Sequence, residues 1–161
     1  MSLRLRLLGR MRLGTMARAM SWWPPFIGAG VSIRATDDHT LEVRMPLRWY
    51  NRNIVGTHFG GSLYAMCDPF YMMILLHHLG PAYVVWDKAA TVRFKRPGRG
   101  AVRARFHIPP ATVAQIRAQA DAEPKVEPQF TVEVLAADGT VVAEVEKLLY
   151  VRRRTPAREA A

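Results

Sequence analysis

The chain has 161 residues, half of them hydrophobic, and a formal net charge of +10. This length and composition predict one compact domain with a sizeable core. The longest apolar stretch, around residues 70–76, is too short to span a membrane, and a single cysteine, Cys67, excludes an internal disulfide.

The positive charge is concentrated at the two ends of the sequence. Residues 1–20 contain five arginines and no acid, and residues 151–161 contain four arginines against Glu159. Within the nearly neutral body, residues 87–105 hold seven Lys and Arg side chains against Asp87. Such a cluster either binds a compact polyanion, such as the phosphates of a nucleotide, or is a solvated face. We expect no nucleic-acid partner.

The N-terminal segment, residues 1–20, is basic and amphipathic. It predicts a first helix that packs on the domain through leucine and methionine, with a membrane-surface helix or an organellar transit peptide as alternatives. Two prolines at positions 24 and 25 break that helix. We therefore expect an N-terminal helix and linker at 1–25, one domain at 26–152 and a basic tail at 153–161.

The hydrophobic period changes after Gly28, where two strands are predicted with an Asp-Asp-His turn between them. A helix that is apolar on nearly every side follows at about residues 63–79. Four more strands and a short helix flanked by prolines complete the pattern. The predicted strands are 31–35, 40–47, 83–94, 101–108, 129–136 and 141–152. This order predicts an α+β fold with one antiparallel sheet wrapped around a long central helix.

The stretch from Asn51 to Gly80 resembles the core motif of hotdog-fold acyl-CoA thioesterases. The likeness is greatest to the phenylacetate-pathway (PaaI-like) group and to a neighbouring YiiD-like branch described as a domain of unknown function. In that group an Asn leads to a small residue, then to His-Gly-Gly, and then to an Asp on the central helix. The matching positions here are Asn53, Gly56, Gly60, Gly61 and Asp68.

A second stretch, "VVWDKAATVRFKRPGRG", is similar to the third strand of that family, so the resemblance covers about residues 28–152. One position departs from the family pattern. Where the thioesterases carry a histidine before the glycine pair, this chain has Phe59, and His58 stands one residue earlier.

Thioester hydrolysis requires donors for the developing oxyanion and a group that acts on water or attacks directly. The unshielded N–H groups of Gly60 and Gly61 suit the first role, and Asp68 suits the second because it is the only acid between Glu42 and Asp87. Asn53 either orients the carbonyl or water, or is a turn residue. Asp68, followed by proline, is alternatively a helix N-cap.

The remaining predicted site residues bind substrate: His58, Phe59, Lys88, Arg96 and Arg99. The predicted function is hydrolysis of an acyl-CoA or acyl carrier protein thioester, without metal or cofactor, in the cytoplasm. The resemblance implies a homodimer or homotetramer in which one subunit supplies the glycine donors and another supplies the acid. A non-catalytic hotdog module that binds an acyl group or a partner protein is the main alternative, and a dehydratase is a lesser one.

Overall fold

The computed structural model describes residues 12–154. Two N-terminal helices precede a strand hairpin, two central helices follow, and four strands with one inserted helix complete the chain. The bounds are α2 Leu13–Ser21, α3 Pro24–Ala29, β1 Ser32–Asp37, β2 Thr40–Met45, α4 Gly60–Ala65, α5 Phe70–Leu79, β3 Tyr83–Phe94, β4 Val102–His107, α6 Pro110–Ala122, β5 Gln129–Ala136 and β6 Val141–Arg153. The predicted α+β class is confirmed.

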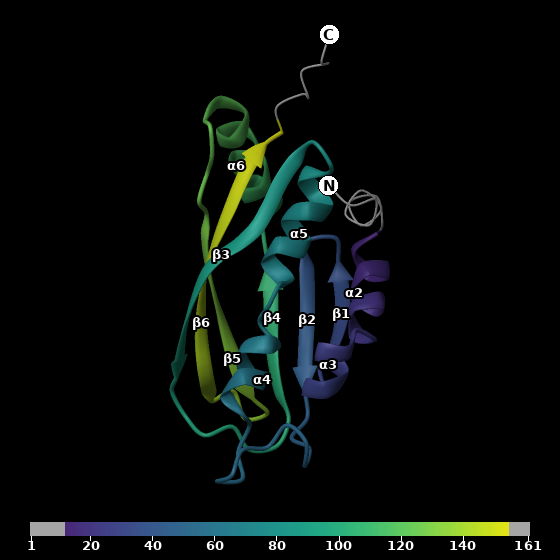
Figure 1. Cartoon of the computed structure of the whole chain (residues 1–161), viewed down its shortest axis with the longest axis vertical. Coiled ribbons are helices and arrows are strands. Elements are labelled where there is room, and N and C mark those ends of the chain that lie inside the picture. The colour runs from purple at the N-terminus through teal and green to yellow at the C-terminus, as the bar shows by residue number, and fades with distance from the viewer. Residues whose placement is uncertain (1–11, 155–161) are drawn as a thin grey trace.

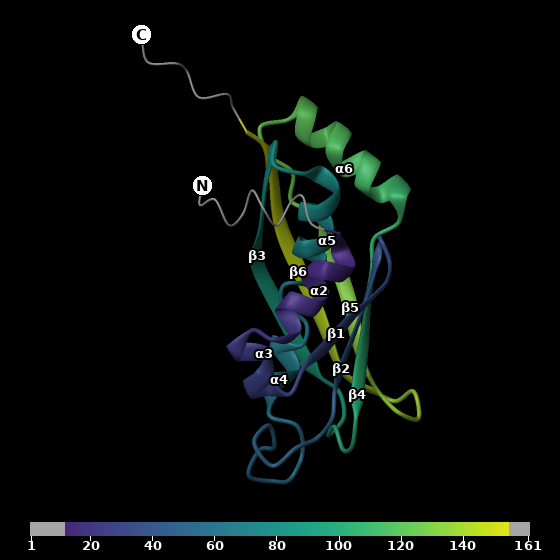
Figure 2. The ribbon, with the colours of Figure 1, turned by 90° about the vertical axis from the view of Figure 1, so that its right-hand side faces the viewer.

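The six strands form one antiparallel sheet in the order β1-β2-β4-β5-β6-β3. The sheet curls around α4 and α5, with β3 at one edge and β1, flanked by α2, at the other (Figure 1). Seen from the side, α6 lies at the upper end of the molecule and α3 and α4 lie towards the lower end (Figure 2).

The core forms where alternating strand residues meet α5. In β4, Val102, Ala104 and Phe106 are buried while the residues between them are exposed. Phe70 of α5 packs on Phe106 with ring centroids 5.0 Å apart. The period-two pattern thus gives the sheet one face that buries the helices and one face that meets solvent.

The central helical segment is interrupted between residues 66 and 69. The sequence predicts one helix at about residues 63–79, and the structure has two helices, α4 and α5, on either side of a short break. Pro69 lies immediately before α5 and lacks the N–H that would continue a helix through it. The break leaves Asp68 outside both helices.

The N-terminal helix packs on the sheet through Leu13, Met16 and Ala17, as the amphipathic pattern predicts. The two prolines that follow do more than end it, because Pro24 and Pro25 occupy the first turn of α3. Over residues 12–154, no helix is long and apolar enough to cross a membrane.

Two loops meet at the lower end of the molecule and set up the site. One runs from β2 to α4 over residues 46–59, and the other joins β3 to β4. The N–H of His58 donates to the Gly98 carbonyl at 3.1 Å, and that of Leu47 donates to the Gly100 carbonyl at 3.2 Å. The β2–α4 loop is therefore held against the β3–β4 loop where α4 begins.

Candidate functional site

A cavity of about 530 Å³ lies between these two loops and the start of α4. It brings together five of the predicted site residues: Asn53, His58, Gly60, Arg96 and Arg99. Leu63, Phe94 and Pro97 are among the other lining residues. A larger hollow of about 610 Å³ on the outer sheet face is lined by Arg34, Arg103 and Arg105, and none of the predicted site residues lines it.

Two aromatic rings explain why residues 60 and 61 are both glycine. A Cβ atom at Gly60 would lie 2.9 Å from Cζ of Phe94, and one at Gly61 would collide with the ring of Phe59. The rings therefore approach the backbone at the start of α4 more closely than a side chain would allow. The first-turn N–H groups have no acceptor within the helix, and no side chain caps α4.

The side chain of Asn53 builds the β2–α4 loop. Its Oδ1 accepts hydrogen bonds from the N–H of Val55 at 3.1 Å and of Thr57 at 3.0 Å. Its Nδ2 donates to Thr57 Oγ1 at 2.9 Å and to the His58 carbonyl at 3.3 Å. Because both ends of the amide are engaged, these contacts match the turn alternative for Asn53.

His58 is buried on the cavity wall. Its Nε2 lies 2.8 Å from the Gly100 carbonyl, so Nε2 carries the proton and donates it to that oxygen. Nδ1 is then an unprotonated acceptor, and it has no hydrogen-bond partner among the described residues. Burial lowers the pKa of His58, although the hydrogen bond to Gly100 opposes this. The ring is therefore a neutral imidazole at neutral pH.

Asp68 contacts Lys147, which is not among the predicted site residues. Oδ1 of Asp68 lies 2.5 Å from Nζ of Lys147, which projects from β6 and is 1% exposed. Asp87 Oδ1 lies 3.1 Å from the same Nζ, within ion-pair distance but outside hydrogen-bond geometry. Tyr64 OH accepts a hydrogen bond from Nζ at 3.3 Å. One buried ammonium therefore joins α4, the helix break, β3 and β6.

The charges in this cluster affect one another. Burial alone would lower the pKa of Lys147, but the hydrogen bond to Asp68 and the charges of both carboxylates outweigh it, so the pKa is raised. Burial raises the pKa of Asp87, and the negative charge of Asp68 adds to this while Lys147 opposes it. The lysine is thus the fixed positive charge between two acids.

The contacts of Asp68 do not match the N-cap alternative. α5 begins at Phe70 after Pro69, and no side chain caps its first turn. Cys67, next to Asp68, is fully buried, and burial raises the pKa of its thiol to about 12. A thiol with this pKa is not a nucleophile at neutral pH, in keeping with its predicted place in the core.

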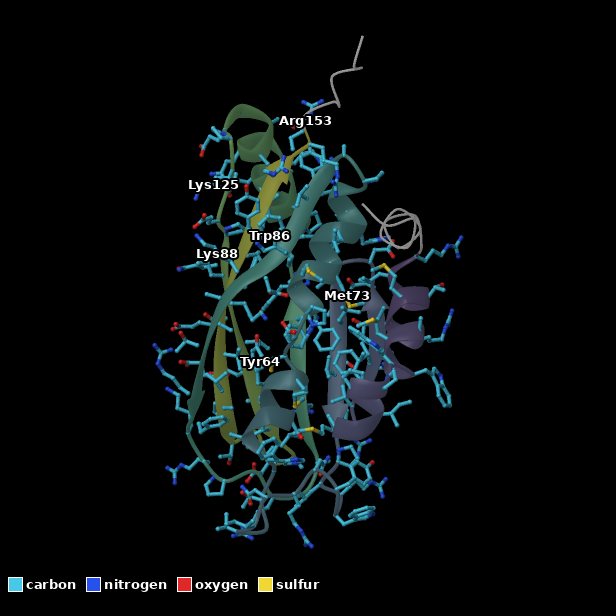
Figure 3. The ribbon with its side chains drawn as sticks, in the orientation of Figure 1. Tyr64, Met73, Trp86, Lys88, Lys125 and Arg153 are labelled. Carbon is cyan, nitrogen blue, oxygen red and sulfur yellow. The ribbon has the colours of Figure 1, made fainter. Side chains whose placement is uncertain are left out.

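The predicted basic cluster of residues 87–105 does not converge on the cavity. Lys88 lies in a β-bulge of β3, where its ammonium pairs with Glu127 at 2.8 Å. Figure 3 shows Lys88 at the outer edge of the sheet, apart from the lower end where the cavity lies. Arg93 pairs with Glu146 at 2.6 Å, and Arg103 and Arg105 are on the outer face of β4. Only Lys95, Arg96 and Arg99 line the cavity.

Within one chain, Asp68 does not share the cavity at the start of α4, where the glycine pair lies. Gly60 begins α4, whereas Asp68 lies eight residues later, in the break between α4 and α5. Asp68 does not line the cavity that contains Gly60. Two groups that act on the same carbonyl must both reach one site. Among the described residues, no three His, Cys, Asp or Glu side chains are grouped as metal ligands.

The position of Lys147 in the sequence indicates its burial, although Lys147 is not among the predicted site residues. In β6, Val145, Leu149 and Val151 are buried at alternate positions, and Lys147 falls on the same series. A lysine on the inward face of a strand requires a buried partner. The alternation alone therefore indicates a buried ion pair with one of the acids nearby.

The curled antiparallel sheet around a central helical segment is the fold of the thioesterase-like hotdog superfamily. The chain belongs to the family described as "Domain of unknown function (DUF4442)", whose model matches residues 13–151. No curated protein matches the sequence.

Solved structures with the same fold have low sequence identity to this chain. A probable thioesterase of unknown function from Pseudomonas aeruginosa has a TM-score of 0.79 and 22% identity, over 87% of this chain and 95% of that one. A thioesterase from Haemophilus influenzae has a TM-score of 0.63 and 13% identity, over 88% and 92%. A mutant thioesterase from Pseudomonas aeruginosa has a TM-score of 0.66 and 14% identity, over 88% and 94%.

Proposed function

We propose that the protein hydrolyses the thioester bond of an acyl-CoA. The observation that carries this proposal is the position of Asp68: its carboxylate is 39% exposed, lies in the break of the central helical segment and is fixed by Lys147. A carboxylate held in one place and still open to solvent suits a general base or a nucleophile. Several proteins that share the fold are described as thioesterases.

The cavity at the start of α4 is the proposed binding site for the rest of the substrate. The N–H groups of Gly60 and Gly61 would stabilise the oxyanion, because they have no acceptor within α4. Arg96 and Arg99 would contact the phosphates of CoA. His58 and Phe59 would line the part of the site that holds the thioester group of the substrate. Lys88 has no place in this arrangement, because it pairs with Glu127.

The proposed active site requires two copies of the chain. β3 has twelve residues and one unpaired edge, and Ala89, Ala90 and Thr91 near its middle are exposed. Two such edges can pair antiparallel about a two-fold axis. Pairing centred near Ala90 places the Phe94 end of one strand beside the Trp86 end of the other. Phe94 lies against Gly60. Asp87, next to Trp86, shares Lys147 with Asp68. This pairing would therefore bring each glycine pair towards the partner subunit's Asp68.

The alternative is a hotdog module that binds an acyl group or a partner protein without hydrolysis. Two observations favour it: Phe59 replaces the histidine of the resembling thioesterases, and the amide of Asn53 already makes its hydrogen bonds within the loop.

The proposed location of the protein is the cytoplasm, because acyl-CoA is the proposed substrate and the single cysteine, Cys67, is a free thiol. The proposed reaction uses no metal or cofactor.

A panel of acyl-CoA substrates of increasing chain length tests the proposal, with release of free CoA thiol as the measurement. We expect turnover of at least one chain length, and loss of that turnover in Asp68→Asn. Saturable binding of acyl-CoA without thiol release, at any chain length, would support the non-catalytic module instead.

A further inference from the structure

Three of the four tryptophans of the chain are exposed near one end of the molecule. Trp22 is 78% exposed and Trp49 is 82% exposed, whereas a tryptophan in a soluble protein is usually largely buried. Trp23, Ile27 and Tyr50 are each about half exposed. We call these five residues, Trp22, Trp23, Ile27, Trp49 and Tyr50, the tryptophan surface.

The two segments that carry these residues touch each other. Trp23 and Ile27 are four residues apart at the start of α3, so they share one face of that helix. Gly30 ends α3, and a Cβ atom placed there would lie 3.2 Å from the Tyr50 hydroxyl. Asn51 Nδ2 donates to the Ala29 carbonyl at 2.8 Å. Trp49 packs edge-on against Tyr50. These contacts hold residues 49–51 beside the end of α3, so the exposed side chains of the two segments are close to one another.

The surroundings of the tryptophan surface are basic. Residues 12–36 and residues 43–67 contain no aspartate or glutamate, and each stretch contains three arginines. Arg18 precedes Trp22 by one helical turn, and Arg48 and Arg52 flank the aromatic pair of the loop. All three arginines are exposed, and within residues 12–154 none of them pairs with an acid.

A second copy of the chain that pairs through β3 would not cover the tryptophan surface. α2 packs on β1, at the opposite edge of the sheet from β3 (Figure 1). The surface does lie near the cavity: α3, α4 and the 46–59 loop occupy the same lower end in both views (Figures 1 and 2). Val55 of that loop is 71% exposed and also lines the cavity.

We infer that the tryptophan surface binds the interface of an anionic lipid bilayer. Tryptophan and tyrosine favour the headgroup region because one part of each ring system is apolar and another is polar. Exposed arginines with no acid nearby are attracted to anionic headgroups. The bilayer would thus contact the end of the molecule that carries the cavity mouth. An uncharged apolar partner protein would leave the three arginines without partners.

Co-sedimentation of the full chain with lipid vesicles tests this inference independently of any hydrolysis. We expect binding to vesicles of phosphatidylcholine with phosphatidylglycerol, and weak binding to phosphatidylcholine alone. Trp22→Gln combined with Trp49→Gln should reduce binding at least tenfold, and Arg18→Gln combined with Arg48→Gln should remove the preference for the anionic lipid. Brominated lipids should quench the wild-type tryptophan fluorescence.

Matched controls use exposed residues of the same types elsewhere. Trp86→Gln on β3 and Arg34→Gln on the outer face of β1 should leave vesicle binding unchanged. The inference is overturned if the wild type does not bind anionic vesicles, or if the double tryptophan variant binds as well as the wild type. Dissociation of an oligomer by that variant in light scattering would show a protein contact instead.

Discussion

Nζ of Lys147 lies 2.5 Å from Oδ1 of Asp68, so a lysine that is 1% exposed is paired with the acid proposed to act on the thioester. A buried ammonium is stable only when it is paired and hydrogen-bonded. Asp68 and Asp87 are both ion-pair partners of this lysine. The side chain of Asp68 is 39% exposed, and that of Asp87 is 18% exposed. The same contact thus has a structural role and, under the proposed function, a catalytic one. The two roles can be separated.

Asp68→Asn should lower kcat for acyl-CoA by about 100-fold or more, because the amide cannot act as a base or a nucleophile. Asp87→Asn is the matched control, since it removes the other carboxylate on Lys147 and keeps Asp68. It should retain most of the activity while lowering the melting temperature. Steady-state kinetics and thermal melting of both variants give the result. Equal losses of kcat in the two variants would mean that Asp68 serves only as a partner of Lys147.

Lys147→Met should destabilise the protein by about 3 kcal/mol, because two neighbouring carboxylates lose their common positive charge. The wild type should also lose stability at alkaline pH. The folded pKa of Lys147 is above its unfolded value of about 10.4, so its contribution is complete below that value. It disappears as the pH rises through the folded pKa.

Melting temperatures measured from about pH 9 to about pH 11.5 test this dependence. The wild type should show a steeper alkaline decline than Lys147→Met, which has no lysine to titrate at this place. Parallel declines in the two proteins would contradict the assigned pKa shift.

Most of the fold could be predicted because its signals are local. Strands such as β3 and β5 have the predicted bounds, since alternation and turn residues define them. α3 is not among the predicted elements, because Pro24 and Pro25 both follow one helix and begin another, and proline is favoured in both places. The break at residues 66–69 divides the single helix predicted at 63–79, because how far a proline interrupts a helix depends on tertiary packing.

The candidate site was less predictable because it depends on contacts between distant segments. The loop motif led to Asn53, His58 and Gly60, which do line one cavity. Lys88 was grouped with Arg96 by sequence proximity, yet a β-bulge directs it to Glu127. Lys147 is 79 residues from Asp68, so only the folded sheet brings the two together.

Arg96→Gln combined with Arg99→Gln should raise KM for acyl-CoA about tenfold, because the phosphates lose two cationic partners. KM for a short thioester without the nucleotide should change little. Lys88→Gln is the control for charge, since it removes one cation outside the cavity, and it should leave both KM values near those of the wild type. If the double variant affects both substrates equally, the two arginines do not contact the CoA phosphates.

The unpaired edge of β3 should mediate self-association. Lysines placed at positions 89 and 91, near the centre of the proposed pairing, would face the same positive charges on the partner subunit. Ala89→Lys combined with Thr91→Lys should therefore weaken the dimer at least tenfold, as measured by light scattering over a range of concentrations. Hydrolysis should fall in parallel with dimer content.

Mixing two impaired variants tests whether one active site uses both subunits. In a dimer of Asp68→Asn with Arg96→Gln/Arg99→Gln, one site would combine the intact cavity of the first chain with the intact acid of the second. The other site would contain both defects. Random mixing makes half of the dimers mixed, so about a quarter of the wild-type activity should return at low acyl-CoA concentration. If each subunit had a complete site of its own, mixing would restore nothing beyond the sum of the parents. Recovery is expected because, within one chain, Asp68 does not line the cavity that contains Gly60.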